Sequence, residues 1–247
     1  MNKKLTFAVL MVGQLLFVSK TVAAASTRDW KCFVSTLSGG AVWAGHAQSQ
    51  TYNLAPGVLK TYGEGLASNT IPSGDIFVGM QQVLNAELLG QIGLDFAVTG
   101  AANYSGQVWD DASQEFNNYS YQYKLQNARF TVKGKLLLDE FSWGLPWVSA
   151  SVGAGFNRAY DYSNTPLIFE AVPNSNFSNK TTTSLAYTVG AGVQRSLNPF
   201  WQVGIGYEFA NWGKSSLGAA ATQTENQGIS LSHLYTNAIM FNITYVA

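Results

Sequence analysis

Residues 200–212, FWQVGIGYEFANW, place a large apolar side chain at every second position. Successive side chains of a β-strand point to opposite faces, so this spacing predicts a strand with one apolar face and one small or polar face. Either a protein core or lipid has to cover the apolar face. Its members are Trp201, Val203, Ile205, Tyr207 and Phe209.

The same alternation recurs along the chain and predicts eight strands. No helical periodicity interrupts it, so the expected fold class is all-β. The eight runs are residues 33–45, 75–84, 89–99, 119–135, 147–157, 184–194, 200–212 and 235–245.

The connections between the runs alternate between short and long. Short turns are expected near residues 85–86, 139–144 and 197–199, and long polar loops at 47–73, 104–118, 161–181 and 215–230. Transmembrane β-barrels show this asymmetry, with short periplasmic turns and longer external loops. The pattern therefore predicts an eight-stranded antiparallel up-and-down transmembrane β-barrel with both termini on the periplasmic side.

Composition favours lipid as the solvent of the apolar face. Charged residues make up 11% of the chain, against roughly 25% in typical soluble domains. A secreted β-sandwich is the alternative, but its water-facing positions should be rich in lysine, glutamate and threonine. No basic run or nucleic-acid motif is present, so nucleic acid is not an expected partner. No apolar segment beyond the N-terminal one is long enough for a helical membrane span.

The first residues have the layout of a secretory signal peptide. Lys3 and Lys4 precede an apolar run, and small residues lead to a plausible cleavage point after Ala24 or Ala25. The apolar run is too short to serve as a membrane anchor. We therefore expect residues 1–25 to be removed and residues 26–247 to form the barrel. Cys32 is the only cysteine, which excludes an intrachain disulfide.

Aromatic residues fall where two membrane interfaces would lie. Three of them, Tyr119, Tyr121 and Tyr123, shift the alternation of the fourth run, which predicts a β-bulge or a strand that projects beyond the membrane. The turn-side set is Trp30, Phe33, Phe141, Trp143, Trp147, Phe200, Trp201 and Tyr245. The loop-side set is Trp43, Tyr104, Tyr119, Tyr121, Tyr160, Trp212 and Tyr235.

With these runs, the chain resembles the OmpA/OmpX-like eight-stranded outer-membrane β-barrels of Gram-negative bacteria. The resemblance implies an outer-membrane location and recognition by the barrel-assembly machinery during biogenesis. Such chains normally end in alternating aromatics with a terminal Phe or Trp. Here Phe241 and Tyr245 have suitable spacing, but Val246 and Ala247 follow them. No further domain is expected after the eighth strand.

Four charged residues should point into the barrel lumen by parity: Asp95, Arg129, Lys133 and Glu208. Isolated buried charges cost several kcal/mol or more, so these groups must be paired or hydrated. One interpretation is a salt-bridged network that fills the lumen, with Glu208 paired to Arg129. The other is a gated path for protons or small ions. A wide pore is excluded, because open aqueous channels need about 16 strands.

Enzymatic chemistry is not expected from this chain. Only His46 and His233 could act as imidazole bases, and the neighbouring Ser232 would point to the opposite face of a strand. Asp110 and Asp111 are more simply loop charges or weak calcium ligands. Neither a cofactor nor a specific metal site is expected.

Arg158 has outward parity at the outer rim, where it could pair with a lipopolysaccharide phosphate. It could equally be an ordinary loop residue. The polar loops suit contact with host molecules, phage or neighbouring surface proteins. Two functional classes follow: a structural or surface-interaction barrel with a filled lumen, and a small channel or carrier for ions or a small solute.

Overall fold

The computed structural model describes residues 31–45, 47–67, 70–111, 113–172, 174–226 and 228–247. Within these ranges the fold is all-β, with one short 3-10 helix, η1 (Gln114–Phe116). The predicted signal peptide, Trp30 and His46 lie outside the described residues. No described helix has the length and apolar character needed to cross a membrane.

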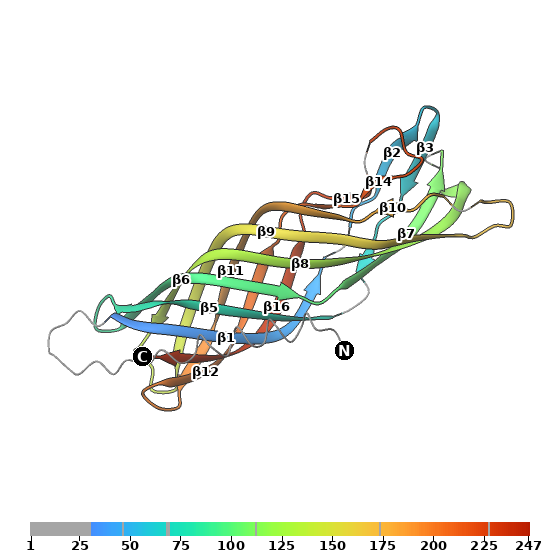
Figure 1. Cartoon of the computed structure of the whole chain (residues 1–247). Coiled ribbons are helices and arrows are strands. Elements are labelled where there is room, and N and C mark those ends of the chain that lie inside the picture. The colour runs from blue at the N-terminus through green and yellow to red at the C-terminus, as the bar shows by residue number, and fades with distance from the viewer. Residues whose placement is uncertain (1–30, 46, 68–69, 112, 173, 227) are drawn as a thin grey trace, which may run out of the picture.

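Eight antiparallel strands close into a barrel, as the alternation predicted (Figure 1). Their order around the barrel is β8, β6, β5, β1, β16, β12, β11 and β9, and β9 pairs back with β8 from Leu137↔Trp147 to Tyr119↔Pro166. The strands are β1 (Lys31–Ala44), β5 (Ile71–Val83), β6 (Leu88–Thr99), β8 (Asn117–Leu138), β9 (Leu145–Pro166), β11 (Lys180–Ser196), β12 (Trp201–Asn211) and β16 (Tyr235–Val246).

One end of the barrel carries only short turns. Asparagine side chains build two of them: Asn85 Oδ1 accepts from the Glu87 amide, and Asn198 Oδ1 accepts from the amides of Phe200 and Trp201, each at 2.9 Å. The start of β1 and the end of β16 lie at this same end, where Phe33 and Ala247 exchange backbone hydrogen bonds. The predicted asymmetry of the connections is confirmed.

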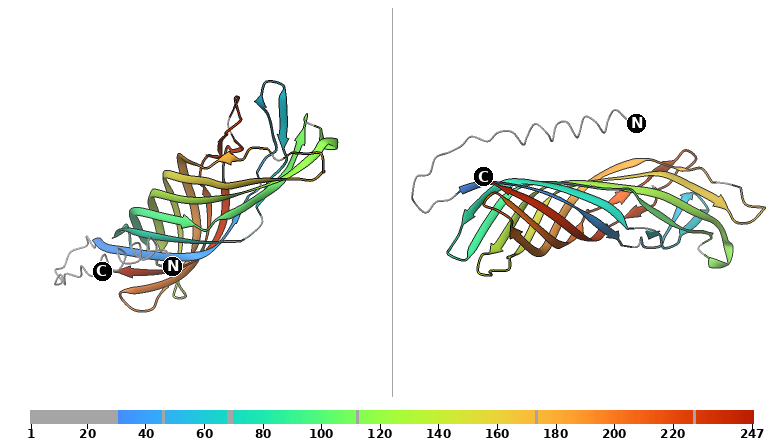
Figure 2. Two further views of the ribbon diagram at one scale, coloured as in Figure 1. Left: turned by 45° about the vertical axis from the view of Figure 1, so that its right-hand side comes forward. Right: turned by 90° about the horizontal axis from the view of Figure 1, so that it is seen from below.

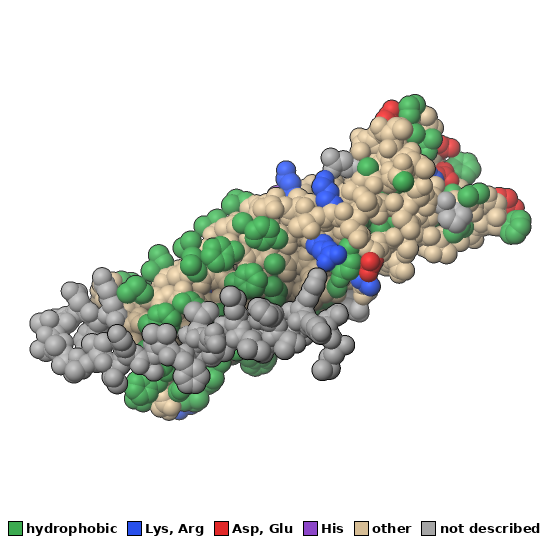
Figure 3. Space-filling model, viewed as in Figure 1, with side chains coloured by type: hydrophobic (Ala, Val, Ile, Leu, Met, Phe, Trp, Pro, Cys, Tyr) green, Lys and Arg blue, Asp and Glu red, His purple; other side chains and the backbone are tan. Residues whose placement is uncertain are grey.

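The outer surface of the barrel is an apolar belt (Figure 3). In the opening stretch Val203, Ile205 and Tyr207 point outward and are 36–48% exposed, while Gly206 between them is buried. Leu94 on β6 and Phe241 on β16 are likewise at least half exposed. A soluble protein would bury such a surface, so the apolar face of FWQVGIGYEFANW is lipid-facing.

At the other end the same sheet continues beyond the barrel as a projection, which we call the extension (Figure 2). It consists of the outer halves of β8 and β9 with four further strands. Residues 104–118 were predicted to be a loop, but they form most of β7 and the helix η1. The prediction was wrong because β8 and β9 are 22 residues long and give β7 a partner beyond the membrane. The four strands are β2 (Gln50–Ala55), β3 (Val58–Tyr62), β4 (Leu66–Ala67) and β7 (Ala102–Asp110).

The remaining external connections contain only short strands. β10 (Phe177–Ser178) pairs with β14 (Gly218–Ala220), and β13 (Ser215–Ser216) pairs with β15 (Ser230–Leu231).

Strand β8 keeps one parity along its whole length. Tyr119, Tyr121 and Tyr123 are buried on the same face as Arg129, so the strand does not change parity, and of the two expectations the projecting strand is the one that agrees with the structure. What changes is the chemistry of that face, which is charged in the barrel and aromatic in the extension. A register irregularity does occur in the β8–β9 pairing beside Tyr123, where Asp161 has a positive φ of 54°.

Five residues of the predicted interface girdles instead point inward. Tyr104, Tyr119, Tyr121 and Trp212 are at most 6% exposed, and Trp147 faces the lumen. The three tyrosines belong to the extension, where aromatic side chains pack on the inner face, and the two tryptophans lie in the lumen of the barrel. The outward girdle residues of the described chain include Phe33, Trp43, Phe141, Trp143, Phe200, Trp201 and Tyr235, each at least 40% exposed.

Stacked and tilted aromatic rings form the core of the extension. Tyr62 contacts Tyr52 at 5.4 Å and Tyr121 at 5.9 Å between ring centroids, and Tyr121 contacts Tyr123 and Tyr162 at 6.3 Å. The Tyr121 hydroxyl donates to the Gly63 carbonyl oxygen at 2.9 Å. Burial raises the pKa of Tyr121 to about 12. The buried phenols therefore remain neutral donors in neutral water.

Glycine on the inner face of β12 makes room for a tryptophan in the narrow lumen. A Cβ on Gly206 would lie 2.3 Å from an atom of the Trp147 ring. By contrast, a Cβ on Gly134 would meet nothing within 4 Å.

Gly206→Ala should destabilise the barrel by about 1 to 3 kcal/mol, because the new methyl group overpacks the Trp147 ring. Urea unfolding of the refolded protein in detergent, followed by heat-modifiable gel mobility, measures this. Gly134→Ala is the matched control and should leave the midpoint unchanged. Adding Trp147→Phe to Gly206→Ala should recover part of the loss. Equal changes of the urea midpoint in Gly206→Ala and Gly134→Ala would contradict the predicted overpacking of the Trp147 ring.

The extension should lose order in alkali before the barrel does. Unfolded tyrosine ionises near its ordinary pKa of 10, whereas the folded Tyr121 has a pKa of about 12. Above pH 10 the unfolded state therefore binds fewer protons, and stability falls as pH rises. Tyrosinate absorbance and limited proteolysis across this range measure the transition. Titration of every tyrosine near pH 10 with no loss of protease resistance would contradict it.

Candidate functional site

The structure brings the four predicted lumen charges together. Arg129 Nη2 lies 2.5 Å from Glu208 Oε1, and Arg129 Nε lies 3.6 Å from Asp95 Oδ2. Lys133 Nζ lies 3.0 Å from Asp95 Oδ1 and 3.5 Å from Glu208 Oε2. The side chains come from β6, β8 and β12, and none is more than 13% exposed. Each cation thus contacts both acids in one ring of charge, which we call the lumen network.

A tryptophan covers the lumen network on the extension side. The Arg129 guanidinium carbon lies 4.7 Å from the centroid of the Trp212 ring, a cation–π contact. Trp212 Nε1 donates to Thr236 Oγ1 at 2.8 Å, and its carbonyl oxygen accepts from Asn157 Nδ2 at 2.7 Å. These bonds hold the indole across the lumen, so protein side chains separate the charges from the extension.

Parity reasoning overlooked two further inward charges. Asp75 on β5 is 5% exposed and Lys135 on β8 is 9% exposed. Lys135 Nζ donates to Gln194 Oε1 at 2.5 Å and lies 4.5 Å from the centroid of the Trp147 ring. Both positions have the lumen parity of their runs, so the alternation rule could have found them. With them, three acids face three bases in the described lumen, and the charges balance.

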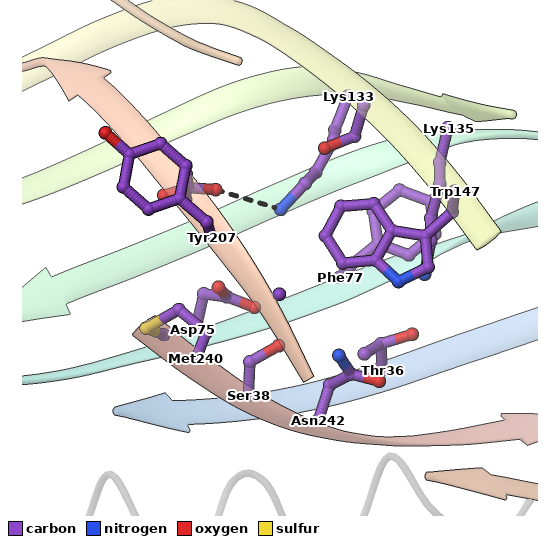
Figure 4. A pocket seen from close by; sticks show the side chains of 13 residues that line it. Thr36, Ser38, Asp75, Phe77, Lys133, Lys135, Trp147, Tyr207, Met240 and Asn242 are labelled. Atoms are coloured by element: carbon purple, nitrogen blue, oxygen red, sulfur yellow. Dashed lines mark hydrogen bonds and ion pairs between the residues drawn. The ribbon is translucent and has the colours of Figure 1, made fainter. Parts of the chain in front are cut away.

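On the turn side, the lumen network borders a small polar cavity of about 40 Å³ (Figure 4). Asp75, Trp147 and Asn242 line it, and each has a buried side-chain atom without a hydrogen-bond partner in the described chain. Those atoms are Asp75 Oδ1, Trp147 Nε1 and Asn242 Oδ1. The volume can hold one to a few water molecules. Water there would satisfy two acceptors and one donor.

The catalytic alternatives are not assembled in the described residues. Asp110 binds Lys60 Nζ at 2.6 Å and also accepts from Asn118. His233 Nδ1 lies 3.4 Å from Asn211 Nδ2, and its ring stacks on Tyr235. No group of three or more His, Cys, Asp or Glu residues suited to a metal ion occurs in the described part of the chain.

Arg158 is exposed on the outer face of β9, with its guanidinium carbon 4.9 Å from the centroid of the Tyr160 ring. None of the described carboxylates lies within ion-pair distance of it. In Figure 3, lysine and arginine side chains gather where the apolar belt ends. Arg158 is therefore placed apart from the lumen network, on the outside of the barrel.

Removing one charge of the lumen network should lower the free energy of unfolding of the barrel more than removing an ion pair does. Arg129→Met leaves Asp95 and Glu208 with a single close cation and should destabilise the barrel by about 3 to 5 kcal/mol. Adding Glu208→Gln restores the charge balance and should recover part of this loss. Urea unfolding of the two single variants and the double variant measures the coupling. Strictly additive effects would contradict the pairing.

No protein-family model matches the chain, and no curated protein matches it in sequence. Among solved structures, it is similar to the outer membrane protease OmpT from Escherichia coli, with TM-score 0.53, 9% identity, and coverage of 91% of this chain and 99% of that one. Neisserial surface protein A aligns with TM-score 0.43 and 13% identity over 86% of this chain and 96% of its own. OprG from Pseudomonas aeruginosa aligns with TM-score 0.40 and 11% identity, covering 90% and 99%.

At such identities the likeness to OmpT concerns the fold and not the activity. The structure itself supplies the strand number and the closure of the barrel. The chain therefore forms an eight-stranded antiparallel β-barrel, and its fold is similar to that of the outer membrane protease OmpT.

Proposed function

We propose that this protein is an integral barrel of the bacterial outer membrane whose filled lumen does not conduct and whose extension serves surface interaction. The short turns and both termini of the barrel domain then face the periplasm, and the extension faces the exterior. The mature chain begins after residue 25. The apolar belt supports membrane insertion. Closure of the barrel supports it as well, because it pairs the backbone polar groups of the barrel strands with one another.

The lumen network is the observation that carries the non-conducting role. Arg129, Lys133, Asp95 and Glu208 lie across the lumen in mutual contact, and Trp212 covers them from the extension side. An ion would have to separate these pairs while shedding its own hydration. The balanced charge gives either sign of ion little net attraction.

The extension supports a role in surface contact. It is an ordered sheet with its own aromatic core, so it can present side chains in fixed positions without a partner. We infer contact with outer-membrane lipid along the belt and with lipopolysaccharide phosphate at Arg158. Host or neighbouring surface molecules are the further candidates at its tip.

Biogenesis through the barrel-assembly machinery is part of this proposal. Phe241 and Ile243 on the last strand point outward and are 63% and 42% exposed, so an assembly factor could read their alternation. Catalysis is not part of it, since His233 contacts Asn211 and Tyr235, and Asp110 is held by Lys60 and Asn118.

A small channel is the second candidate, and the polar cavity favours it. Asp75 extends the line of polar groups from the lumen network toward the turn side. If water fills this cavity, only the lumen network lies between that water and Trp212. Rearrangement of Glu208 would then open a path for protons or small ions.

Single-channel recording of the refolded barrel in a planar bilayer separates the two candidates. The wild type and Glu208→Gln should both be silent, with heat-modifiable gel mobility confirming that each is folded. Glu115→Gln changes an exposed acid of the extension and is the matched control. Reproducible openings that change with Glu208→Gln and not with Glu115→Gln would contradict the filled lumen and support the channel.

A further inference from the structure

The outer faces of β8 and β9 change chemistry in three successive zones. Next to the belt they are apolar, with Phe130 and Phe156 each more than 40% exposed. Further out lie two exposed cations. One is Arg158 on β9, and the other, after Ala128 and Gln126 on β8, is Lys124, which is paired with Asp161 at 3.1 Å. Beyond them, the outward residues of β8 and β9 that line the groove described below are neutral and polar.

The third zone consists of two rows of hydroxyl and amide side chains across β7, β8 and β9. Antiparallel register aligns the residues of each row. Adjacent strands lie roughly 4.8 Å apart, and successive outward residues on one strand roughly 7 Å apart. These spacings are comparable with the dimensions of a single sugar ring. The rows are Ser105, Gln122 and Ser163, followed by Gln107, Ser120 and Thr165.

These six residues line a groove of about 610 Å³ on the outside of the extension. That volume is within the usual range of ligand sites. None of the six side chains has a hydrogen-bond partner elsewhere in the described chain. Serine, threonine and glutamine can each donate and accept, so they match a ligand whose groups also do both.

Trp109 lines the same groove near its far end and is half-buried. Its ring lies against Gly63, where a Cβ would be 3.3 Å from the indole. An indole face fixed in this way can pack against the apolar face of a sugar ring. Glu64 is the only charged residue that lines the groove.

We propose that this groove binds the neutral core sugars of lipopolysaccharide in the surrounding leaflet. The order of the three zones is the order of groups along that molecule: acyl chains, then phosphates, then sugars. Arginine makes strong charge-assisted contacts with phosphate, and neutral hydroxyl and amide groups suit sugar hydroxyls. The groove faces sideways from strands that also carry the lipid belt, so it meets molecules of the same membrane. The inference rests on the proposed outer-membrane location.

The test compares two lipopolysaccharides from one bacterial background. One has a complete core, and the other is truncated next to lipid A and keeps the lipid A phosphates. Binding is titrated by calorimetry to the folded barrel in a zwitterionic detergent, because sugar-headed detergents would compete. The wild type should bind the complete form about tenfold tighter, which corresponds to about 1.4 kcal/mol.

Trp109→Ala and Gln122→Ala should bring this ratio close to one and leave affinity for the truncated form unchanged. Arg158→Ala should weaken both forms and keep the ratio. Trp143→Ala removes an exposed tryptophan at the opposite end and should behave as wild type. Trp109→Phe keeps an aromatic face and should retain most of the preference, and gel mobility confirms that each variant is folded.

Equal affinity of the wild type for the two forms, or a ratio unchanged by Trp109→Ala, would overturn the inference. Competition by maltohexaose as effective as that of the isolated core oligosaccharide would also overturn it, since the groove would then accept neutral glycans in general. If neither lipopolysaccharide binds, the proposed contact of Arg158 with lipopolysaccharide phosphate fails together with the sugar groove. Binding of both without preference defeats only the sugar groove.

Discussion

In a bilayer, a backbone amide or carbonyl without a partner costs several kcal/mol, so a sheet can cross lipid only if it has no free edge. The pairing of β9 back onto β8 removes that edge here. Closure with eight strands then fixes how much room remains inside, and the lumen is just wide enough for side chains. Most large apolar residues of the barrel strands therefore lie outside, and the inside holds mainly small or hydrogen-bonding residues with a few rings such as Trp147. The alternation along every barrel strand follows from this constraint.

The narrow lumen also explains why its charges form one network. Arg129 on β8 contacts Asp95 on the adjacent strand β6, and it also reaches Glu208 on β12 because only a short space separates the two strands across the lumen. A wider barrel would leave these groups to water. Space is limited enough that Gly206 is needed beside Trp147. The balanced charges and the placement of Gly206 therefore both result from the narrow lumen, and both favour a barrel whose lumen stays closed.

Beyond the belt, the outer face of β8 and β9 changes from apolar to polar, while the backbone pattern continues. The inner face therefore becomes the apolar one, and Tyr121 and its neighbours form a core that the barrel itself lacks. The outer face becomes polar in steps, from Phe156 through Arg158 to Ser163. A single pair of strands thus holds both the closure of the lumen and the surface presented to the outside.

The sequence by itself determined the all-β class, the eight barrel strands, the short turns, and the face of the four predicted lumen charges, because side-chain direction in a strand depends only on local alternation. The prediction from sequence was wrong for Tyr104, Tyr121 and Trp212, which were assigned to an outer aromatic girdle and are buried inside. Only the tertiary structure decided that Glu208 meets Arg129, that Lys135 meets Gln194, and that residues 102–110 form a strand. These contacts depend on register and closure between strands far apart in the chain, and alternation within one strand carries no information about its partner's register.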